Sequence, residues 1–201
     1  MHDKTFCSVQ TAVPVGHIAC IVTHLEMSKR PERTDTELPE GITLRRIINP
    51  APEEYKKLYR KIGGDWLWFS RLMIGDKELE EILTSHGTEV FSVQSNNEDV
   101  GMFELDFNTP GQCELSFFGI DSSLTGKGLG KALMNAVMDR VWARPVERFW
   151  VHTCTFDHPA ALQFYQRVGF RAYATEIEIV ADPRITGHLP AEFAQHVPLI
   201  V

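Results

Sequence analysis

Residues 125–131 (TGKGLGK) constrain the fold of this chain more than any other segment. Three glycines at alternate positions lead into a stretch whose apolar residues recur with a helical period; these are Leu129, Leu133, Ala136, Val137 and Val141. The apolar residues 113–120 before it have the character of a strand. A strand, a glycine loop and a helix start predict an anion site, because the first N–H groups of a helix lack partners and its dipole favours negative charge there.

Composition places the chain among globular proteins. Its 201 residues are 43% hydrophobic and 23% charged, which suits one domain with a full core. The net charge of −7, with no run of Lys and Arg interleaved with aromatics, argues against nucleic acid or an anionic membrane as partner.

The cysteines form no C-x-x-C pair, so we expect reduced thiols. With no leader-like or membrane-spanning segment in the sequence, we expect a soluble, cytoplasmic protein.

Turn residues and apolar runs divide the chain into three parts. Residues 1–40 are expected to hold an N-terminal β-hairpin, with strands over residues 6–13 and 17–27, and then a polar linker. Residues 41–180 form the main domain, and residues 181–201 an irregular tail.

The main domain alternates strand and helix patterns. Strands are predicted over residues 42–48, 89–94, 100–107, 113–120, 148–156 and 173–180. Helices are predicted over residues 50–62, 65–74, 76–83, 129–143 and 158–168.

Two common phosphate-binding motifs do not fit the glycine loop. In the dinucleotide pattern G-x-G-x-x-G, the sixth position is Lys131 when counted from Gly126 and Leu133 when counted from Gly128. The P-loop pattern G-x-x-x-x-G-K-[ST] fails because Ala132 follows Lys131.

The loop resembles motif A, Q/R-x-x-G-x-G/A, of the GNAT superfamily of acyl-CoA-dependent N-acetyltransferases, with Thr125 where Gln or Arg is usual. Residues 151–170 resemble the family's motif B, a strand, N-x-x-A, a helix carrying Tyr, and Gly-Phe. Asp157 stands where Asn is usual, while Tyr165 and Gly169-Phe170 match directly. The resemblance covers residues 42–180. It implies an α/β (α+β) GNAT fold with a central mixed, largely antiparallel twisted sheet of about seven strands flanked by helices.

The resemblance also implies acetyl-CoA as the acyl donor, and we expect no metal. Amides of the glycine loop would hold its pyrophosphate, and the fourth strand of the family core would pair with its pantetheine arm. The residues implied are Phe118, Gly119, Ile120, Thr125, Gly126, Lys127, Gly128, Leu129, Gly130, Lys131, Asp157 and Tyr165.

Three residues are candidates for proton transfer. Tyr165 stands at the family's general-acid position, and a phenol with a pKa near ~10 is protonated at neutral pH. Glu114 and Glu104 are candidate bases for the attacking ammonium, although ordered water could serve instead and either glutamate could be a solvated strand residue. By strand parity, we expect Glu114 to share a face with Ser116, Phe118 and Ile120.

The resemblance further implies that the first two helices and their connection wall the acceptor site. The aromatic residues Trp66, Trp68 and Phe69 there could bind the acceptor or pack in the core. His152, Cys154 and His158 could hold a metal or form an acyl-cysteine, but zinc needs four ligands and direct transfer is favoured.

The implied function is acetyl transfer to the primary amine of a small molecule by direct attack. Two alternatives stay open: a protein or peptide N-acetyltransferase, and a non-catalytic acyl-CoA-binding sensor. The N-terminal hairpin could cover a sheet edge, line the acceptor site or mediate a homodimer.

Overall fold

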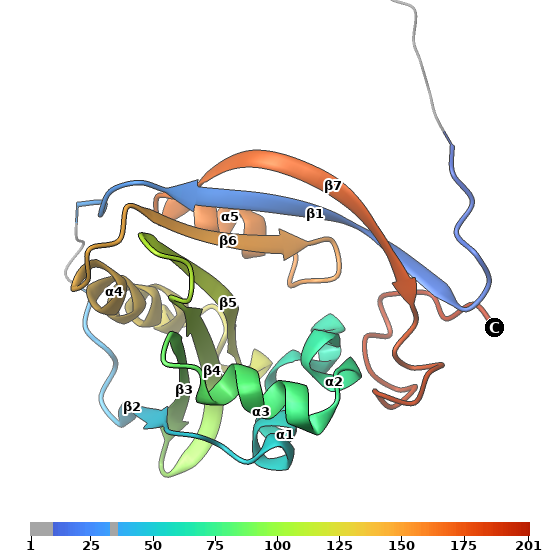
Figure 1. The fold of residues 1–201 in the computed structure, drawn as a ribbon, viewed down its shortest axis with the longest axis horizontal. Coiled ribbons are helices and arrows are strands. Elements are labelled where there is room, and N and C mark those ends of the chain that lie inside the picture. Colours follow the sequence, from blue (N-terminus) through green and yellow to red (C-terminus); the bar gives the residue numbers. More distant parts are fainter. Residues whose placement is uncertain (1–9, 33–35) are drawn as a thin grey trace, which may run out of the picture.

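A computed structural model describes residues 10–32 and 36–201. Its centre is one seven-stranded sheet with the order β2-β3-β4-β5-β6-β1-β7 (Figure 1). The strands are β1 (His17–Met27), β2 (Ile42–Ile47), β3 (Thr88–Ser95), β4 (Glu98–Asp106), β5 (Gln112–Ile120), β6 (Arg148–Cys154) and β7 (Arg171–Ala181). β5 and β6 run parallel, and the other neighbouring strands are antiparallel. This confirms the mixed, largely antiparallel sheet that the resemblance implied.

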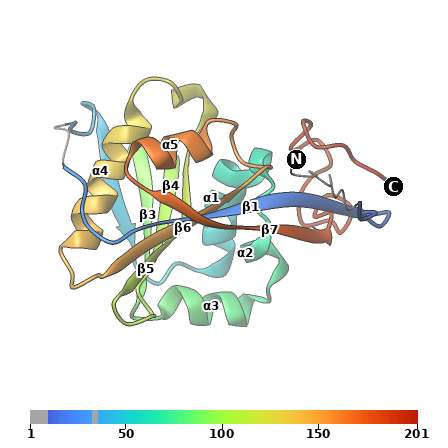
Figure 2. The same ribbon diagram turned by 90° about the horizontal axis from the view of Figure 1, so that it is seen from above.

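Helices cover both faces of the sheet (Figure 2). The α1–α3 face carries α1 (Pro52–Gly63), α2 (Ser70–Met73) and α3 (Asp76–Thr84); the α4–α5 face carries α4 (Leu129–Trp142) and α5 (Ala161–Arg167). Each face packs on its own apolar core, one around Tyr59 and Met102 and the other around Leu133 and Phe149. In the described part of the chain, no helix has the length and apolar character needed to cross a membrane.

The described residues form no N-terminal hairpin. Residues 10–13 form no strand, and residues 6–9 lie outside the described residues. β1 instead lies inside the sheet between β6 and β7, with Val22 opposite both Cys154 and Glu176. The apolar alternation of residues 17–27 predicted a strand correctly, but strand partners are set by contacts far along the chain.

The expected helix over residues 65–74 is largely wrong. A 3-10 turn, Gly64–Trp66, continues α1, and Leu67 then adopts a left-handed conformation with φ of 53°. The Trp68 amide donates to the Gly63 carbonyl at 3.0 Å, which closes the helix end. Regular helix resumes only at α2, so the aromatic residues lie on an irregular connection.

β5 and β6 pair only where they begin. The register joins Gln112 to Arg148 and Glu114 to Trp150. From Leu115 to Ile120, β5 has no β6 residue opposite it among the described residues, so the two strands separate. This separation leaves an opening in the middle of the sheet.

A bulge in β5 overturns the parity expected from the sequence. On β4, Leu105 faces Leu115 whereas Glu104 faces Phe117, which leaves Ser116 as an extra residue. Phe118 and Ile120 consequently pack on the α4–α5 core, while Phe117 packs on the α1–α3 core. Glu114 lies between Cys113 and Leu115, which point into the α4–α5 core, so it points to the α1–α3 face. Glu114 therefore does not share a face with Phe118 and Ile120.

Candidate functional site

The glycine loop offers backbone donors at the start of α4. Gly126 and Gly128 have φ of 75° and 83°, the left-handed region that favours glycine. No neighbouring heavy atom lies within 4 Å of the position that a Cβ would take at either residue. Among the described residues, the amides of residues 126–130 donate to no backbone carbonyl. Unpaired amides on an open surface at a helix N-terminus form the geometry that an anion requires.

The side chains of Thr125 and Lys127 are engaged with carbonyls that precede the loop, and not with its amides. Thr125 Oγ1 donates to the Ser122 carbonyl at 2.7 Å, and Lys127 Nζ donates to the Ser123 carbonyl at 3.0 Å. Lys131 lines a hollow of about 170 Å³ beside α4, together with Arg30 and Arg167. The donors that the loop leaves free are therefore its backbone amides. The adjoining hollow has mixed charge, because Glu32 also lines it and Arg30 is paired with Asp139.

The opening between β5 and β6 leads directly to this loop. Phe118, Gly119 and Ile120 lie on the part of β5 that β6 does not pair with. Ser116 Oγ, at the bulge, is buried and has no hydrogen-bond partner in the described residues. A buried hydroxyl without a partner, beside an unpaired strand edge, fits a ligand that carries amide and carbonyl groups.

Tyr165 lies under this opening on the α4–α5 face. Its side chain is buried, and its ring centre lies 6.5 Å from that of Phe118 and 5.8 Å from that of Phe170. Burial, with a smaller effect from the charge of Asp157, raises the pKa of Tyr165 well above its ordinary value. The phenol is therefore protonated at neutral pH.

Asp157 holds the end of β6. Its Oδ2 accepts hydrogen bonds from Thr153 Oγ1 at 2.7 Å and from the Cys154 amide at 2.9 Å. Asp157 thus shapes the strand end next to the opening.

Glu104 has a different environment from the one that a base requires. It is fully buried on β4, accepts a short hydrogen bond from Tyr55, and pairs with Arg71 Nη2 at 2.7 Å. Arg71 keeps its charge, because Glu104 raises the pKa of the guanidinium against the opposing effect of burial. With both carboxylate oxygens engaged, Glu104 joins α1, α2 and β4 and is poorly placed to accept a proton from an acceptor.

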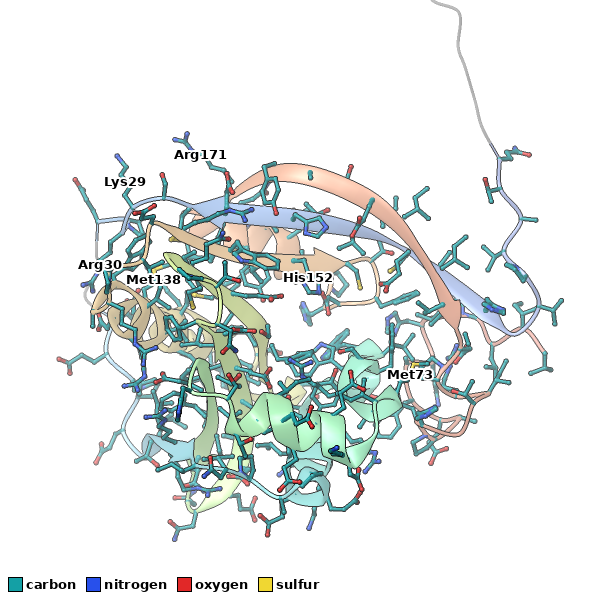
Figure 3. The ribbon with its side chains drawn as sticks, in the orientation of Figure 1. Lys29, Arg30, Met73, Met138, His152 and Arg171 are labelled. Atoms are coloured by element: carbon teal, nitrogen blue, oxygen red, sulfur yellow. The ribbon has the colours of Figure 1, made fainter. Side chains whose placement is uncertain are left out.

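Glu114 lies at the edge of the opening and has a partner that the sequence did not indicate. His152 Nδ1 on β6 is 3.5 Å from Glu114 Oε1, and the side chains are 46% and 24% exposed, so solvent reaches both. The carboxylate raises the pKa of His152. Figure 3 shows His152 on β6, on the side of the strand toward α2. Because Trp150 precedes it at the last paired position, His152 reaches Glu114 at the point where the strands part.

The three aromatic candidates have different positions. Trp68 packs closely against two glycines. A Cβ at Gly63 would lie 2.1 Å from the nearest Trp68 ring atom, and a Cβ at Gly119 would lie 3.0 Å from one. Trp68 therefore supports the unpaired half of β5 from the α1–α3 face. Trp66 is half-buried, and its ring lies 5.1 Å from His158 and 5.8 Å from His196. Phe69 is half-buried at the start of α2.

His152, Cys154 and His158 do not converge. His152 pairs with Glu114, while His158 Nδ1 accepts from the Ala160 amide at 3.1 Å. The described residues include no group of three or more His, Cys, Asp or Glu that could hold a metal. A hydrogen bond with Cys20 lowers the pKa of the half-buried Cys154.

Comparison with known proteins matches residues 52–170 to the model of the acetyltransferase (GNAT) family. The mycothiol acetyltransferase of Saccharopolyspora erythraea is 24% identical over 151 residues, which cover 73% of this chain and 49% of that protein. A GCN5-related N-acetyltransferase from Sphaerobacter thermophilus has a TM-score of 0.57 at 16% identity, over 82% of this chain and 53% of that chain. This chain thus spans about half the length of both proteins.

A GNAT family acetyltransferase from Elizabethkingia anophelis, solved with acetyl-CoA bound, has a TM-score of 0.51 at 18% identity. The alignment covers 68% of this chain and 80% of that chain. At these identities, the solved structures establish a shared fold.

Proposed function

The chain belongs to the acetyltransferase (GNAT) family, and from this we propose that it transfers an acetyl group from acetyl-CoA to the primary amine of a small molecule by direct attack. The observation that carries the proposal is the continuity of two features. Unpaired amides of residues 126–130 lie at one end of β5, and an opened strand edge runs from there to Glu114.

The chain's own groups fit acetyl-CoA at both ends of this path. Amides of Gly126, Gly128 and Gly130 would hold the pyrophosphate, and Lys131, on the first turn of α4, would pair with a further phosphate oxygen. The free edge of β5 at Phe118 and Ile120 would pair with the amides of the pantetheine arm, as an added strand would. Bound acetyl-CoA supplies a thioester carbonyl for the amine to attack, with the CoA thiolate as leaving group.

Tyr165 would give a proton to the departing sulfur. A phenol is a weaker acid than a thiol, whose ordinary pKa is ~8.5, and burial weakens Tyr165 further. Full transfer is therefore uphill, and Tyr165 would help by partial donation in the transition state.

Glu114 and His152 would take the proton that the attacking ammonium must lose. Both lie where β5 and β6 separate, which is the apex of the opening. They are on the α1–α3 face, and both side chains are partly exposed to solvent. Tyr165 lies on the opposite face. Acid and base on opposite sides of one opening suit an amine that attacks from one face while the thiolate leaves on the other.

A panel of primary amines would test the proposal. Purified protein is incubated with acetyl-CoA and tryptamine, spermidine, glucosamine or a lysine peptide, and CoA thiol release and acetylated product are measured. We expect release that depends on a small amine. Acetylation of the peptide alone would favour the protein-directed alternative. Tight acetyl-CoA binding without release on any acceptor would favour a sensor, and parallel initial-velocity lines would favour an acyl-enzyme at Cys154.

A further inference from the structure

The segment after β7 lacks helix and strand but is held firmly against the body of the protein. Leu189 and Ala194 are each 2% exposed and belong to the α1–α3 core. Figure 1 shows the segment, residues 182–201, folded back beside α2 at the end of β7. An irregular segment with buried anchors has a defined position, so what holds it is informative.

Arg184 organises this segment from its centre. The guanidinium donates to Asp182 through Nε at 3.0 Å and Nη2 at 2.7 Å, and both side chains are 1% exposed. Nη1 also donates to the carbonyls of Ala194 at 3.1 Å and Val197 at 2.9 Å. One buried fork of donors therefore ties the end of β7 to the far part of the segment, which an ammonium group could not do with the same geometry.

The part of the segment that Arg184 fixes contacts the aromatic connection after α1. A Cβ at Gly64 would lie 2.8 Å from the Phe193 ring, so the ring packs directly on the backbone there. His196 Nε2 lies 3.2 Å from the Phe156 carbonyl, and its ring lies 5.8 Å from Trp66. His196 thus bridges the connection after α1 and the loop after β6.

Trp66 consequently lies between two histidines from distant parts of the chain. His158 follows Asp157 in the loop between β6 and α5, and its ring lies 5.1 Å from Trp66 on an edge. His158 and His196 are exposed and Trp66 is half-buried, so each of the three side chains is at least partly open to solvent. The cluster borders Asp157, which shapes the strand end at the opening.

We propose that residues 182–201 form a wall of the acceptor site, with His196 as a specificity-determining residue and Arg184 as the positioning residue that holds it against Trp66. This inference rests on the proposed acetyl transfer. The three rings would contact the organic portion of the amine, while Glu114 and His152 act on its nitrogen. Acetyl-CoA would bind from the α4–α5 face and would therefore not contact this wall.

Two variants test the proposal with tryptamine and methylamine as acceptors. His196→Ala removes an exposed ring. Arg184→Lys keeps the buried charge but loses the guanidinium hydrogen bonds to Asp182, Ala194 and Val197. We expect each to raise the tryptamine KM about ten-fold. The acetyl-CoA KM and the methylamine rate should stay within about two-fold, because neither involves the wall. His188→Ala, in the same segment without a ring contact to Trp66, and Arg171→Lys are the matched controls.

Chymotrypsin cleavage gives a readout independent of activity. Arg184→Lys should speed cleavage after Phe193, because that ring is no longer held against Gly64. Unchanged cleavage would overturn the positioning role of Arg184. If amines are acetylated but both variants keep the wild-type tryptamine KM, this inference alone fails. If no amine is acetylated, the proposed function fails and the inference fails with it.

Discussion

The two sides of the opening are built in different ways. On the α4–α5 face, the loop proposed to hold the pyrophosphate is one contiguous stretch, residues 126–130, and its donors are backbone amides. On the α1–α3 face, Trp66, His152, His158 and His196 come from four segments and are placed by side-chain contacts. A site made of backbone depends on a few permitted conformations, whereas a site made of side chains depends on the packing beneath it. Substitutions in the loop and substitutions in the packing beneath the α1–α3 face should therefore have different effects.

The largest effect is expected from the packing beneath the α1–α3 face. Glu104→Gln would leave the Arg71 charge without its partner in a mostly buried position. We expect the free energy of unfolding to fall by about 3 kcal/mol, measured by urea denaturation. Glu81→Gln is the control, because Glu81 forms an exposed pair with Lys77 and should change stability by no more than about 0.5 kcal/mol. Wild-type stability with a large loss of kcat would instead make Glu104 the base.

The next largest effect tests the backbone of the loop. Gly128→Val adds a branched side chain at φ of 83° and fills the open space before the amides. We expect acetyl-CoA affinity to fall about 100-fold in calorimetric titration, because the amides can no longer approach the pyrophosphate. Gly41→Val is the matched control: Gly41 has φ of 79° and equally open surroundings but lies at the start of β2. Equal losses of affinity in both variants would attribute the effect to backbone strain alone.

Tyr165→Phe tests proton donation without altering the loop. We expect kcat to fall at least about 10-fold while the acetyl-CoA KM changes little, since the variant removes only the hydroxyl. Initial-velocity measurements give both constants. An unchanged kcat would leave Tyr165 as a packing residue against Phe118 and Phe170.

The smallest effect concerns the charge pair at the apex. NMR titration should place the pKa of His152 above ~6.5, and Glu114→Gln should lower it. Because the folded pKa is raised, the pair stabilises the protein fully below ~6.5, and this contribution is lost as pH rises through the folded value. The contribution should stay below about 1 kcal/mol, because both side chains reach solvent. A pKa that Glu114→Gln leaves unchanged would contradict the pairing.

Local patterns predicted most elements correctly. The period that begins at Leu129 predicted a helix close to α4 (Leu129–Trp142), and apolar runs predicted β3 to β7 within a few residues. These elements bury residues at regular spacing, so the pattern is visible in any short window. The hairpin failed because β1 pairs with β6 and β7, and the second helix failed because Leu67 adopts a left-handed conformation.

The candidate site residues show the same difference between local patterns, which the sequence reveals, and long-range contacts, which it does not. The glycine loop and Tyr165 lie in contiguous motifs, and the opened edge of β5 runs between them. One extra residue at Ser116 reversed the expected faces of Phe118 and Ile120, because a bulge shifts strand parity and no local pattern marked it. The pairing of His152 with Glu114 depends on the β5–β6 register, which strand parity on one strand alone cannot give.

The sequence by itself determined the order of the core elements, because local periodicity records it, and it indicated the family and the candidate pyrophosphate loop through the resemblance to motifs A and B. Only the tertiary structure decided which glutamate is buried with Arg71, which one reaches solvent beside His152, and that residues 182–201 return to Trp66. Those outcomes are set by contacts between segments far apart in the chain, and no short window of the sequence records such contacts.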